Sequence, residues 1–409
     1  MTTYRTTQAA PNRGMSRRPL ASFDANPVGG IVLAAVNSLG PNYLLMDGAT
    51  NYSAARYPAL VAALAAGNLA RSTFGTTREI TNASGGLGSG FSSWGAGFGY
   101  NGNEIVDNFT SISPTCISSD GGNNWSELAP WITYNVNGAM DAQLHGANGI
   151  RIQINDASSR AYTQLPPYTS QRSSPVLPIA PNINAVAADR LGNVLYAAAY
   201  NQIYLSTDDL LTVGTLQAAA GSAGNVRGLA WTGAYWVAVV DTGTVFKIFR
   251  SNSPGTSWTD VTPGTVWTRD TTSVAVRSDG NGLVVALHLA GKTLVSTDHG
   301  ATWTGLNTAF SGGGNAQGLF FLWTGKYFWM LDKGLWSTDG VTWTASPSPP
   351  TITGSLKAVW RDPQVGVFAL YSGASGGLVI YPFDTTFFQL VPPLDWTSRL
   401  PARYFVRAW

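Results

Sequence analysis

Cysteine and histidine are nearly absent from this 409-residue chain, which holds one cysteine and three histidines. A single thiol excludes an internal disulfide framework and a cysteine-rich metal site, and we expect Cys116 to be a buried strand residue. His145, His288 and His299 stand far apart and show no metal-ligand spacing. The sequence therefore predicts no metal site and no other cofactor.

Charge and long apolar runs are also scarce. Charged residues make up 11% of the chain, against about 25% in an average globular protein. A formal net charge of +2 is too small to favour nucleic-acid binding. No apolar run approaches the roughly 20 residues that span a bilayer, and the N-terminus lacks the apolar segment of a secretory signal. The 46 glycines, 15 tryptophans and 44% hydrophobic residues are typical of an all-β protein with many turns.

The clearest pattern present is an eight-residue motif at 296–303, Ser-Thr-Asp-His-Gly-Ala-Thr-Trp. An aspartate two residues after a serine can accept hydrogen bonds from backbone N–H groups across the following turn. Gly300 can take a positive φ that other residues resist, and Trp303 can bury its ring where two strands meet. We expect a tight turn that stabilises itself.

Copies of the motif recur at a nearly constant interval. They start at positions 118, 206, 251, 296 and 337, so the last three steps are 45, 45 and 41 residues. The first step spans two periods, and we expect a degenerate copy near Asp156 to Tyr162. The turn-forming residues of the copies are Ser118, Asp120, Gly122, Trp125, Asp208, Gly255, Trp258, Ser296, Asp298, Gly300, Trp303, Asp339 and Trp343.

Short apolar strands precede each motif, as at 228–250 and 272–296. Together the copies give seven units of about 40 to 48 residues, each of four strands. A four-stranded unit has two apolar faces, which packing around an axis buries. The sequence therefore predicts a mainly β fold with a seven-bladed β-propeller over residues 85–386. Over this range the chain resembles the Asp-box (bacterial neuraminidase repeat) propellers, which implies that the motif aspartates are structural.

The segment before the repeats has a different pattern. Residues 27–32 and 40–48 predict two strands, and 57–64 predict a short helix that starts near Pro58. Their sequences, Pro-Val-Gly-Gly-Ile-Val, then Gly-Pro-Asn-Tyr-Leu-Leu-Met-Asp-Gly, then Tyr-Pro-Ala-Leu, resemble the tail-collar domain of bacteriophage tail fibres. The resemblance implies a small α+β domain in a virion protein.

That family continues to a Phe-x-Leu-Pro stretch and a final strand. Here the matching pieces, 388–392 and 404–408, come only after the repeats. We therefore expect the propeller to be inserted in a collar-like domain built from 19–80 and 387–409, because the ends of a propeller lie close together. Alternatively, 387–409 form the outer strand of the last blade and a tail.

Two further segments bracket these domains. Residues 1–18 contain four arginines and no acidic residue. They form either a solvated terminus or an N-terminal arm that docks on another virion protein. The Ser- and Gly-rich segment 84–93 has the composition of a linker into the propeller.

An Asp-box propeller suggests a sialidase first, but the residues argue against one. Sialidases usually carry an Arg-Ile-Pro segment before the first Asp box, and none occurs here. A sialidase also needs a glutamate in the middle of the propeller. The chain has only three glutamates: Glu79 and Glu104 come before the first motif, and Glu127 directly follows its tryptophan.

Other hydrolases use paired carboxylates. Asp241 and Asp332 fall at equivalent turns between a second and a third strand, which can face the mouth of the propeller. A purely structural turn would repeat in the same way, so we assign no catalytic residue. By position alone, the candidate ligand-binding residues are Tyr200, Asp241, Asp332 and Lys333.

These observations predict a bacteriophage virion structural protein, a tail fibre or tail-associated protein. Its collar-like domain and arm would bind other virion proteins, and its propeller would act as an adhesion module for a host-surface receptor or glycan. The alternative is a glycan-cleaving enzyme, a glycoside hydrolase or depolymerase with carboxylates at the propeller mouth. A third hypothesis is an assembly factor like the Asp-box photosystem proteins, against which the collar-like flanks argue. No coiled-coil heptads occur, which leaves the oligomeric state, a homo-oligomer included, open.

Overall fold

The computed structural model of the chain describes residues 31–34, 43–46, 52–63, 69–70, 74–81, 95–108, 115–128, 142–145, 149–155, 160–165, 168, 171–173, 185–189, 192–198, 202–212, 214–216, 224–255, 257–264, 267–268, 274–288, 292–307, 320–346, 355–362, 364–372, 377–384, 387–390 and 403–407. The predicted arm 1–18 and linker 84–93 lie outside these residues.

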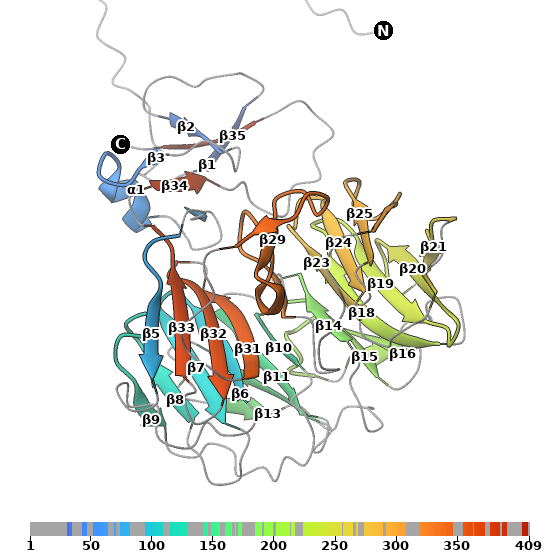
Figure 1. The fold of residues 1–409 in the computed structure, drawn as a ribbon, viewed down its shortest axis with the longest axis horizontal. Helices are drawn as coiled ribbons and strands as arrows, with labels where there is room; N and C mark the ends of the chain where they lie inside the picture. The colour runs from blue at the N-terminus through green and yellow to red at the C-terminus, as the bar shows by residue number, and fades with distance from the viewer. Residues whose placement is uncertain are drawn as a thin grey trace, which may run out of the picture.

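Of the nine sheets in the described residues, seven are antiparallel sheets whose first three strands are consecutive in the chain (Figure 1). We name them blades 1 to 7, and the prediction of seven four-stranded units is confirmed. The blades are β6 (Gly95–Tyr100), β7 (Asn103–Asn108), β8 (Thr115–Ser118) and β9 (Ser126–Leu128); β10 (Ala142–His145), β11 (Arg151–Asn155), β12 (Arg160–Gln164) and β13 (Gln171–Ser173); β14 (Ala185–Ala188), β15 (Val194–Ala198), β16 (Gln202–Ser206) and β17 (Thr215–Leu216); β18 (Asn225–Trp231), β19 (Trp236–Asp241), β20 (Val245–Ser251) and β21 (Thr259–Asp260), with β22 (Trp267–Thr268) also paired to β20; β23 (Val274–Ser278), β24 (Val284–His288), β25 (Lys292–Ser296) and β26 (Thr304–Asn307); β27 (Phe321–Trp323), β28 (Phe328–Met330), β29 (Leu335–Ser337) and β30 (Thr344–Ala345); and β31 (Ser355–Asp362), β32 (Gly366–Ser372), β33 (Gly377–Pro382) and β5 (Arg78–Thr81).

The hydrophobic core is divided among the interfaces between neighbouring blades. Every residue of β19 and β24 is buried, as expected for strands with apolar side chains on both faces. Val239 of blade 4 shares a cluster with Ala286 of blade 5, and Val106 of blade 1 shares one with Trp360 of blade 7. Seven such clusters join the seven pairs of neighbours, so the blades close into a β-propeller.

Strand register places the motif at the same point of every blade. A residue at the start of each second strand pairs with the motif serine or its replacement, as in Val284 with Ser296 and Glu104 with Ser118. In blade 2 the equivalent pair is Arg151 with Gln164. The degenerate copy therefore starts at Gln164, and its expected position near Asp156 to Tyr162 is wrong, because 160–164 is the third strand itself.

The motif residues form the expected self-stabilised turn. In blade 5 the Ser296 hydroxyl donates to Asp298 and accepts the Gly300 N–H group, both at 2.8 Å. The Asp298 carboxylate also accepts the N–H groups of Ala301 and Thr302 at 2.9 Å. Turns that start at 118, 206 and 337 repeat this hydrogen-bond set.

The fifth motif position also docks each turn on the preceding blade. Gly300 has φ of +81°, and a Cβ atom added there would lie 2.7 Å from Cγ2 of Val237 in blade 4. In blades 2 and 3 this position holds Tyr168 and Leu210, both at positive φ and fully buried in the interface with the preceding blade. The turn thus joins two blades, not only two strands.

This contact predicts a cost for Gly300→Ala. The substitution combines a strained left-handed backbone with the clash against Val237, so we expect the free energy of unfolding to fall by about 2–4 kcal/mol. Gly264→Ala is the control, because nothing lies within 4 Å of a Cβ added there, and it should change stability by less than about 0.5 kcal/mol. Denaturant unfolding measures both. Equal stability of the two variants would contradict the docking role.

The ring is closed by a strand from far along the chain. β5 pairs with β33 through Ile80 and Leu378, among other pairs, and is the fourth strand of blade 7. Residue 80 is therefore not the end of the flanking domain, and the propeller includes 78–81 in addition to the predicted range. The alternative that 387–409 supply this outer strand is wrong.

Strands from both flanks of the propeller pair with each other in two small sheets. One has the order β1 (Ile31–Ala34), β35 (Arg403–Arg407), β2 (Tyr43–Leu45), and the other β3 (Tyr52–Ser53), β34 (Phe387–Leu390), β4 (Leu69–Ala70). The predicted helix is α1 (Pro58–Ala63), which buries Leu60 completely. We call these elements the base; it lies beyond one end of blade 7 (Figure 1).

Candidate binding face

The meander gives the propeller two unlike faces. Because consecutive strands are antiparallel, the first-to-second and third-to-fourth turns of each blade lie at one face, which carries the motif turns. The second-to-third turns lie at the other, which we call the distal face. The base joins the motif face, since Gly75 N–H donates to the carbonyl of Pro382, the last residue of β33, at 2.8 Å.

Asp241 lies at the distal face of blade 4, at the end of β19. It is 2% exposed. One carboxylate oxygen accepts the Gly243 N–H group at 2.9 Å, and the other lies 3.4 Å from an Arg227 nitrogen. Asp241 therefore orders its own turn and balances a neighbouring cation.

Asp332 and Lys333 lie at the distal face of blade 6, in the short 3₁₀ helix η3 (Leu331–Lys333). Their charged groups are 3.7 Å apart. Burial raises the pKa of Asp332, and the Lys333 charge opposes this shift. The pKa of Tyr371 in blade 7 is raised by burial and also by Asp332, so the site reaches the next blade.

The structure brings only two of the four predicted ligand residues together. Asp332 and Lys333 form an ion pair, whereas Asp241 is on blade 4, with blade 5 between them. Tyr200 lies outside the described residues. The two aspartates are thus on separate blades, and no described contact joins them.

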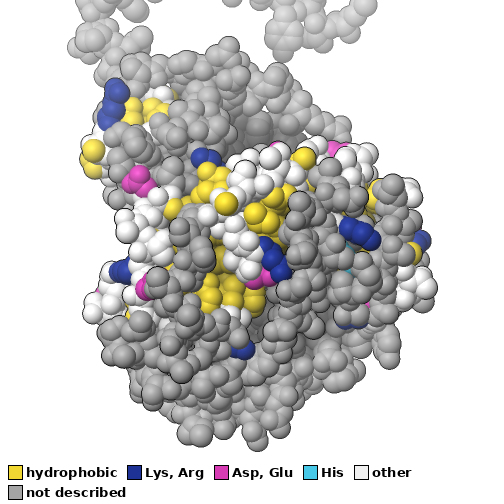
Figure 2. Space-filling view, viewed as in Figure 1, with side chains coloured by type: hydrophobic (Ala, Val, Ile, Leu, Met, Phe, Trp, Pro, Cys, Tyr) yellow, Lys and Arg dark blue, Asp and Glu magenta, His cyan; other side chains and the backbone are white. Residues whose placement is uncertain are grey.

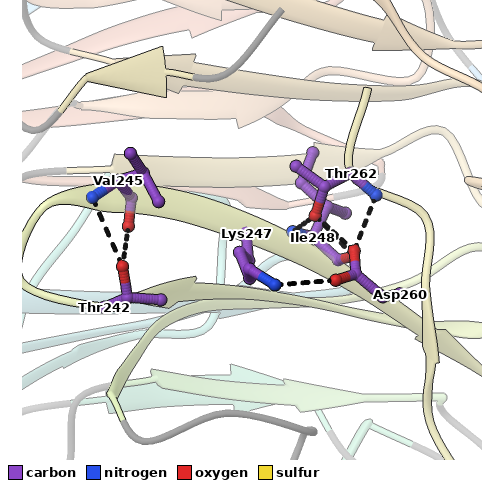
Figure 3. A network of polar contacts seen from close by, with 6 residues as sticks. All are labelled: Thr242, Val245, Lys247, Ile248, Asp260 and Thr262. Carbon is purple, nitrogen blue, oxygen red and sulfur yellow. Dashed lines mark hydrogen bonds and ion pairs between the residues drawn. The ribbon is translucent and has the colours of Figure 1, made fainter. Parts of the chain in front are cut away.

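The outer edge of blade 4 holds a polar network that sequence reasoning missed (Figure 3). The Thr262 hydroxyl accepts the Ile248 N–H group at 2.9 Å, where it replaces a backbone partner. Asp260 accepts the Thr262 N–H group at 3.0 Å and pairs with Lys247 at 3.0 Å. Burial acts to raise the pKa of Asp260, but hydrogen bonds from Thr262 and the Lys247 charge lower it overall. The signal in the sequence was the short Asp-Val-Thr-Pro-Gly run, which interrupts the outer strand.

The distal turn of blade 4, which follows Asp241, has further hydrogen bonds of its own. The Thr242 hydroxyl donates to the Val245 carbonyl at 2.8 Å, and the Val245 N–H group donates back at 3.3 Å (Figure 3). Nothing lies within 4 Å of a Cβ atom added at Gly243, at the tip of this turn. Blades 4 and 6 therefore each present a fixed polar turn with a lysine nearby.

The surface in Figure 2 shows lysine or arginine beside acidic and hydrophobic side chains, with both signs of charge interspersed. Among the described residues, no three His, Cys, Asp or Glu side chains gather as a metal site. No helix in the described part of the chain is long and apolar enough to cross a membrane.

No protein-family model matches the sequence, and no curated protein matches it. Solved structures do match the fold. YCF48 bound to D1 peptide is 16% identical, with a TM-score of 0.51 over 77% of this chain and all of the other. Virginiamycin B lyase from Staphylococcus aureus is 9% identical, with a TM-score of 0.53 over 76% of this chain and 99% of the other. A catalytically inactive variant of that lyase with quinupristin is 10% identical, with a TM-score of 0.53 over 75% of this chain and 99% of the other. These similarities support the β-propeller fold.

Proposed function

We propose that this chain is a structural protein of a bacteriophage tail or tail fibre, whose propeller binds a host-surface glycan or receptor. The observation that carries the proposal is the position of the base. Both of its connections to the propeller leave blade 7 at the motif face, where Phe74 bridges to Phe383. A base anchored to a particle through this face would leave the distal face turned outward.

The collar-like sequence of the flanks supplies the link to a virion, and the pairing of β1 and β2 with β35 agrees with one composite domain. In that setting the base and the arm bind other virion proteins. Two similar propellers are described with a bound molecule, a D1 peptide for YCF48 and quinupristin for the inactive lyase. Binding a separate molecule is therefore a property of this fold class that suits an adhesion module.

The test is binding of the labelled full chain to an array of bacterial surface polysaccharides, with two lysine variants. Lys333→Ala removes a cation from the distal face of blade 6. Lys326→Ala removes one from the motif face of the same blade, where it lies over the Tyr327 ring. We expect Lys333→Ala to weaken binding about tenfold, as for one charged hydrogen bond, and Lys326→Ala to leave it unchanged. If only Lys326→Ala weakened polysaccharide binding, this result would contradict a distal binding face.

The same polysaccharides distinguish adhesion from cleavage. An adhesion module releases no reducing sugar from them. Release that Asp241→Asn abolishes would favour the glycan-cleaving alternative. Binding of no polysaccharide and of no bacterial cell would refute the adhesion role itself.

A further inference from the structure

Two acidic side chains are fully buried where the last blade meets the first. Glu104 is the second residue of β7 in blade 1, Asp362 is the last residue of β31 in blade 7, and both are 0% exposed. Two hydrogen bonds bring their carboxyl groups to the same place. The indole of Trp360, two residues before Asp362, donates to Glu104 at 2.8 Å, and the N–H group of Gly102, two residues before Glu104, donates to Asp362 at 2.8 Å. Both hydrogen bonds cross the interface at which the ring closes, which we call the seam.

The partners of the two groups differ in kind. Asp362 accepts three backbone N–H groups, from Gly102 at 2.8 Å, Gln364 at 2.7 Å and Val365 at 2.9 Å. Asp362 is therefore the acceptor in each of these contacts. Glu104 accepts one hydrogen bond, from the Trp360 indole at 2.8 Å.

The second oxygen of Glu104, Oε1, receives no N–H or O–H group from the described residues. Two ionised carboxylates cannot share a dry contact without a proton between them. One proton between the two buried carboxyl groups removes this repulsion, and we assign it to Glu104, whose pKa is raised by burial and by the charge of Asp362.

No described cation pairs with Glu104. The other titratable groups nearby are Tyr168, Tyr100 and Arg151. Burial raises the pKa of Tyr168, and the charges of Tyr100, Asp362, Glu104 and Arg151 all act on it, which places these groups around the seam. Arg151 is itself buried and donates to Gln164 at 2.7 Å, in blade 2. Loss of the shared proton would leave a second negative charge in the seam.

We propose that the seam between blades 7 and 1 is a proton-dependent latch, closed while Glu104 holds its proton on Asp362 and released when that proton is lost. The step is an ionisation only: the Glu104 O–H bond breaks, the proton passes to solvent, and no other bond is made or broken.

The sign of the pH effect follows from burial. Burial and the negative charge of Asp362 raise the pKa of Glu104 well above its usual value, and the Trp360 hydrogen bond opposes this only in part. In an open seam Glu104 would ionise near its ordinary pKa of 4.5. Opening therefore releases a proton, and it becomes more favourable as pH rises, until the pH passes the pKa of the closed form.

The only cysteine of the chain provides the readout. Cys116 is 1% exposed and packs in the seam cluster with Trp360 and Phe368. N-ethylmaleimide labelling of the full-length protein between pH 6 and pH 9 reports seam opening. Glu104→Gln keeps an acceptor for Trp360 and gains a donor for Asp362 without a titrating proton. The ratio of wild-type to Glu104→Gln labelling rates cancels the intrinsic reactivity of the thiol.

We expect this ratio to rise with pH by up to about tenfold per unit, while Glu79→Gln, an exposed acid on β5, labels like the wild type. Hydrogen exchange should rise in β6 and β31 and stay unchanged in β19 and β24. A ratio that is constant with pH would overturn the latch, as would equal exchange in all blades. If Glu104→Gln does not fold, hydrogen exchange of the wild type between pH 6 and pH 9 decides: exchange in β6 and β31 that rises with pH relative to β19 and β24 supports the latch, and a constant relative rate overturns it.

Discussion

Replacing Ile80 with asparagine lowers the free energy of unfolding of the protein by about 3 kcal/mol, the largest expected effect of a single substitution in the outer strands. Ile80 is half-buried against the cluster that joins blade 7 to blade 1. In the described part of the chain, its strand, β5, is the only one that pairs with the outer edge of β33. A polar side chain there removes apolar contacts and places an amide against Leu378, its partner in the strand pair.

The loss should extend beyond blade 7, because the ring depends on both of its ends. β5 also carries Arg78, which donates to the Gly121 carbonyl in the turn of blade 1 at 3.1 Å. Arg250 makes the equivalent contact from blade 4 to the His299 carbonyl in blade 5 at 3.0 Å. Weakening β5 thus loosens the seam in addition to one sheet.

Glu79→Asn is the matched control, since Glu79 is the neighbouring residue on the exposed side of the same strand. It should cost less than about 0.5 kcal/mol. Guanidinium unfolding followed by tryptophan fluorescence compares the two, and the slope with denaturant should stay the same. Equal losses in both variants, or none in either, would show that β5 does not hold the ring closed.

The seven blades could be predicted from the sequence because the information is local. The Ser-x-Asp turn, its glycine and its tryptophan lie within eight residues, and the hydrogen bonds of Asp298 join residues at most four apart. The alternation of short apolar strands with these turns then fixes the number of units.

The closing strand could not be predicted in this way. Arg-Glu-Ile-Thr at 78–81 has one apolar residue and no turn signal, and its partner is about 300 residues away in the sequence. A signal did exist: three strands of the last unit were recognisable, and no fourth followed them. The turn of blade 2 was misplaced for a related reason, since glutamine replaces the serine and Tyr168 replaces the glycine.

The candidate site was predictable in type but not in arrangement. Asp332 and Lys333 were found because they sit at a turn that repeats, and they do form an ion pair. The pairing of Glu104 with Asp362 depends on ring closure, which no sequence spacing records. Equivalent turns on different blades also share a face without meeting, which is why Asp241 and Asp332 lie apart.

Acidification should destabilise the propeller through its motif turns. The pKa values of Asp120 and Asp298 are both lowered to about 2, and those of Asp208 and Asp339 are lowered too. For Asp120 the largest cause is the Asn124 N–H group. For Asp298 burial acts in the opposite direction, and hydrogen bonds from Thr302, Ser296 and Ala301 outweigh it.

The direction of this pH effect follows from the pKa of the aspartates in the folded and unfolded states. An unfolded aspartate binds its proton near pH 3.8, whereas the folded turn resists protonation until about pH 2. The unfolded chain therefore holds more protons in this window. The stabilisation is complete above pH 3.8 and is lost as the pH falls through the folded pKa.

Asp120 and Asp339 are exposed, and Asp208 and Asp298 are half-buried, so solvent screening reduces the contribution of each carboxylate to about 0.5–1 kcal/mol. The four turns together therefore contribute about 2–4 kcal/mol to the free energy of unfolding above pH 3.8. We expect thermal unfolding at pH 5 and at pH 2.5 to show this loss in the wild type. Asp298→Asn together with Asp339→Asn should flatten the acid dependence by about half, because an asparagine keeps an acceptor oxygen and does not titrate.

Asp332→Asn is the control, since burial raises the pKa of Asp332 and its contribution has the opposite sign. This variant should leave the acid loss as steep as in the wild type or make it steeper. If Asp332→Asn flattened the acid dependence and the double motif variant did not, the acid sensitivity would arise from buried carboxyl groups, and the motif turns would owe their stability to packing against the preceding blade alone.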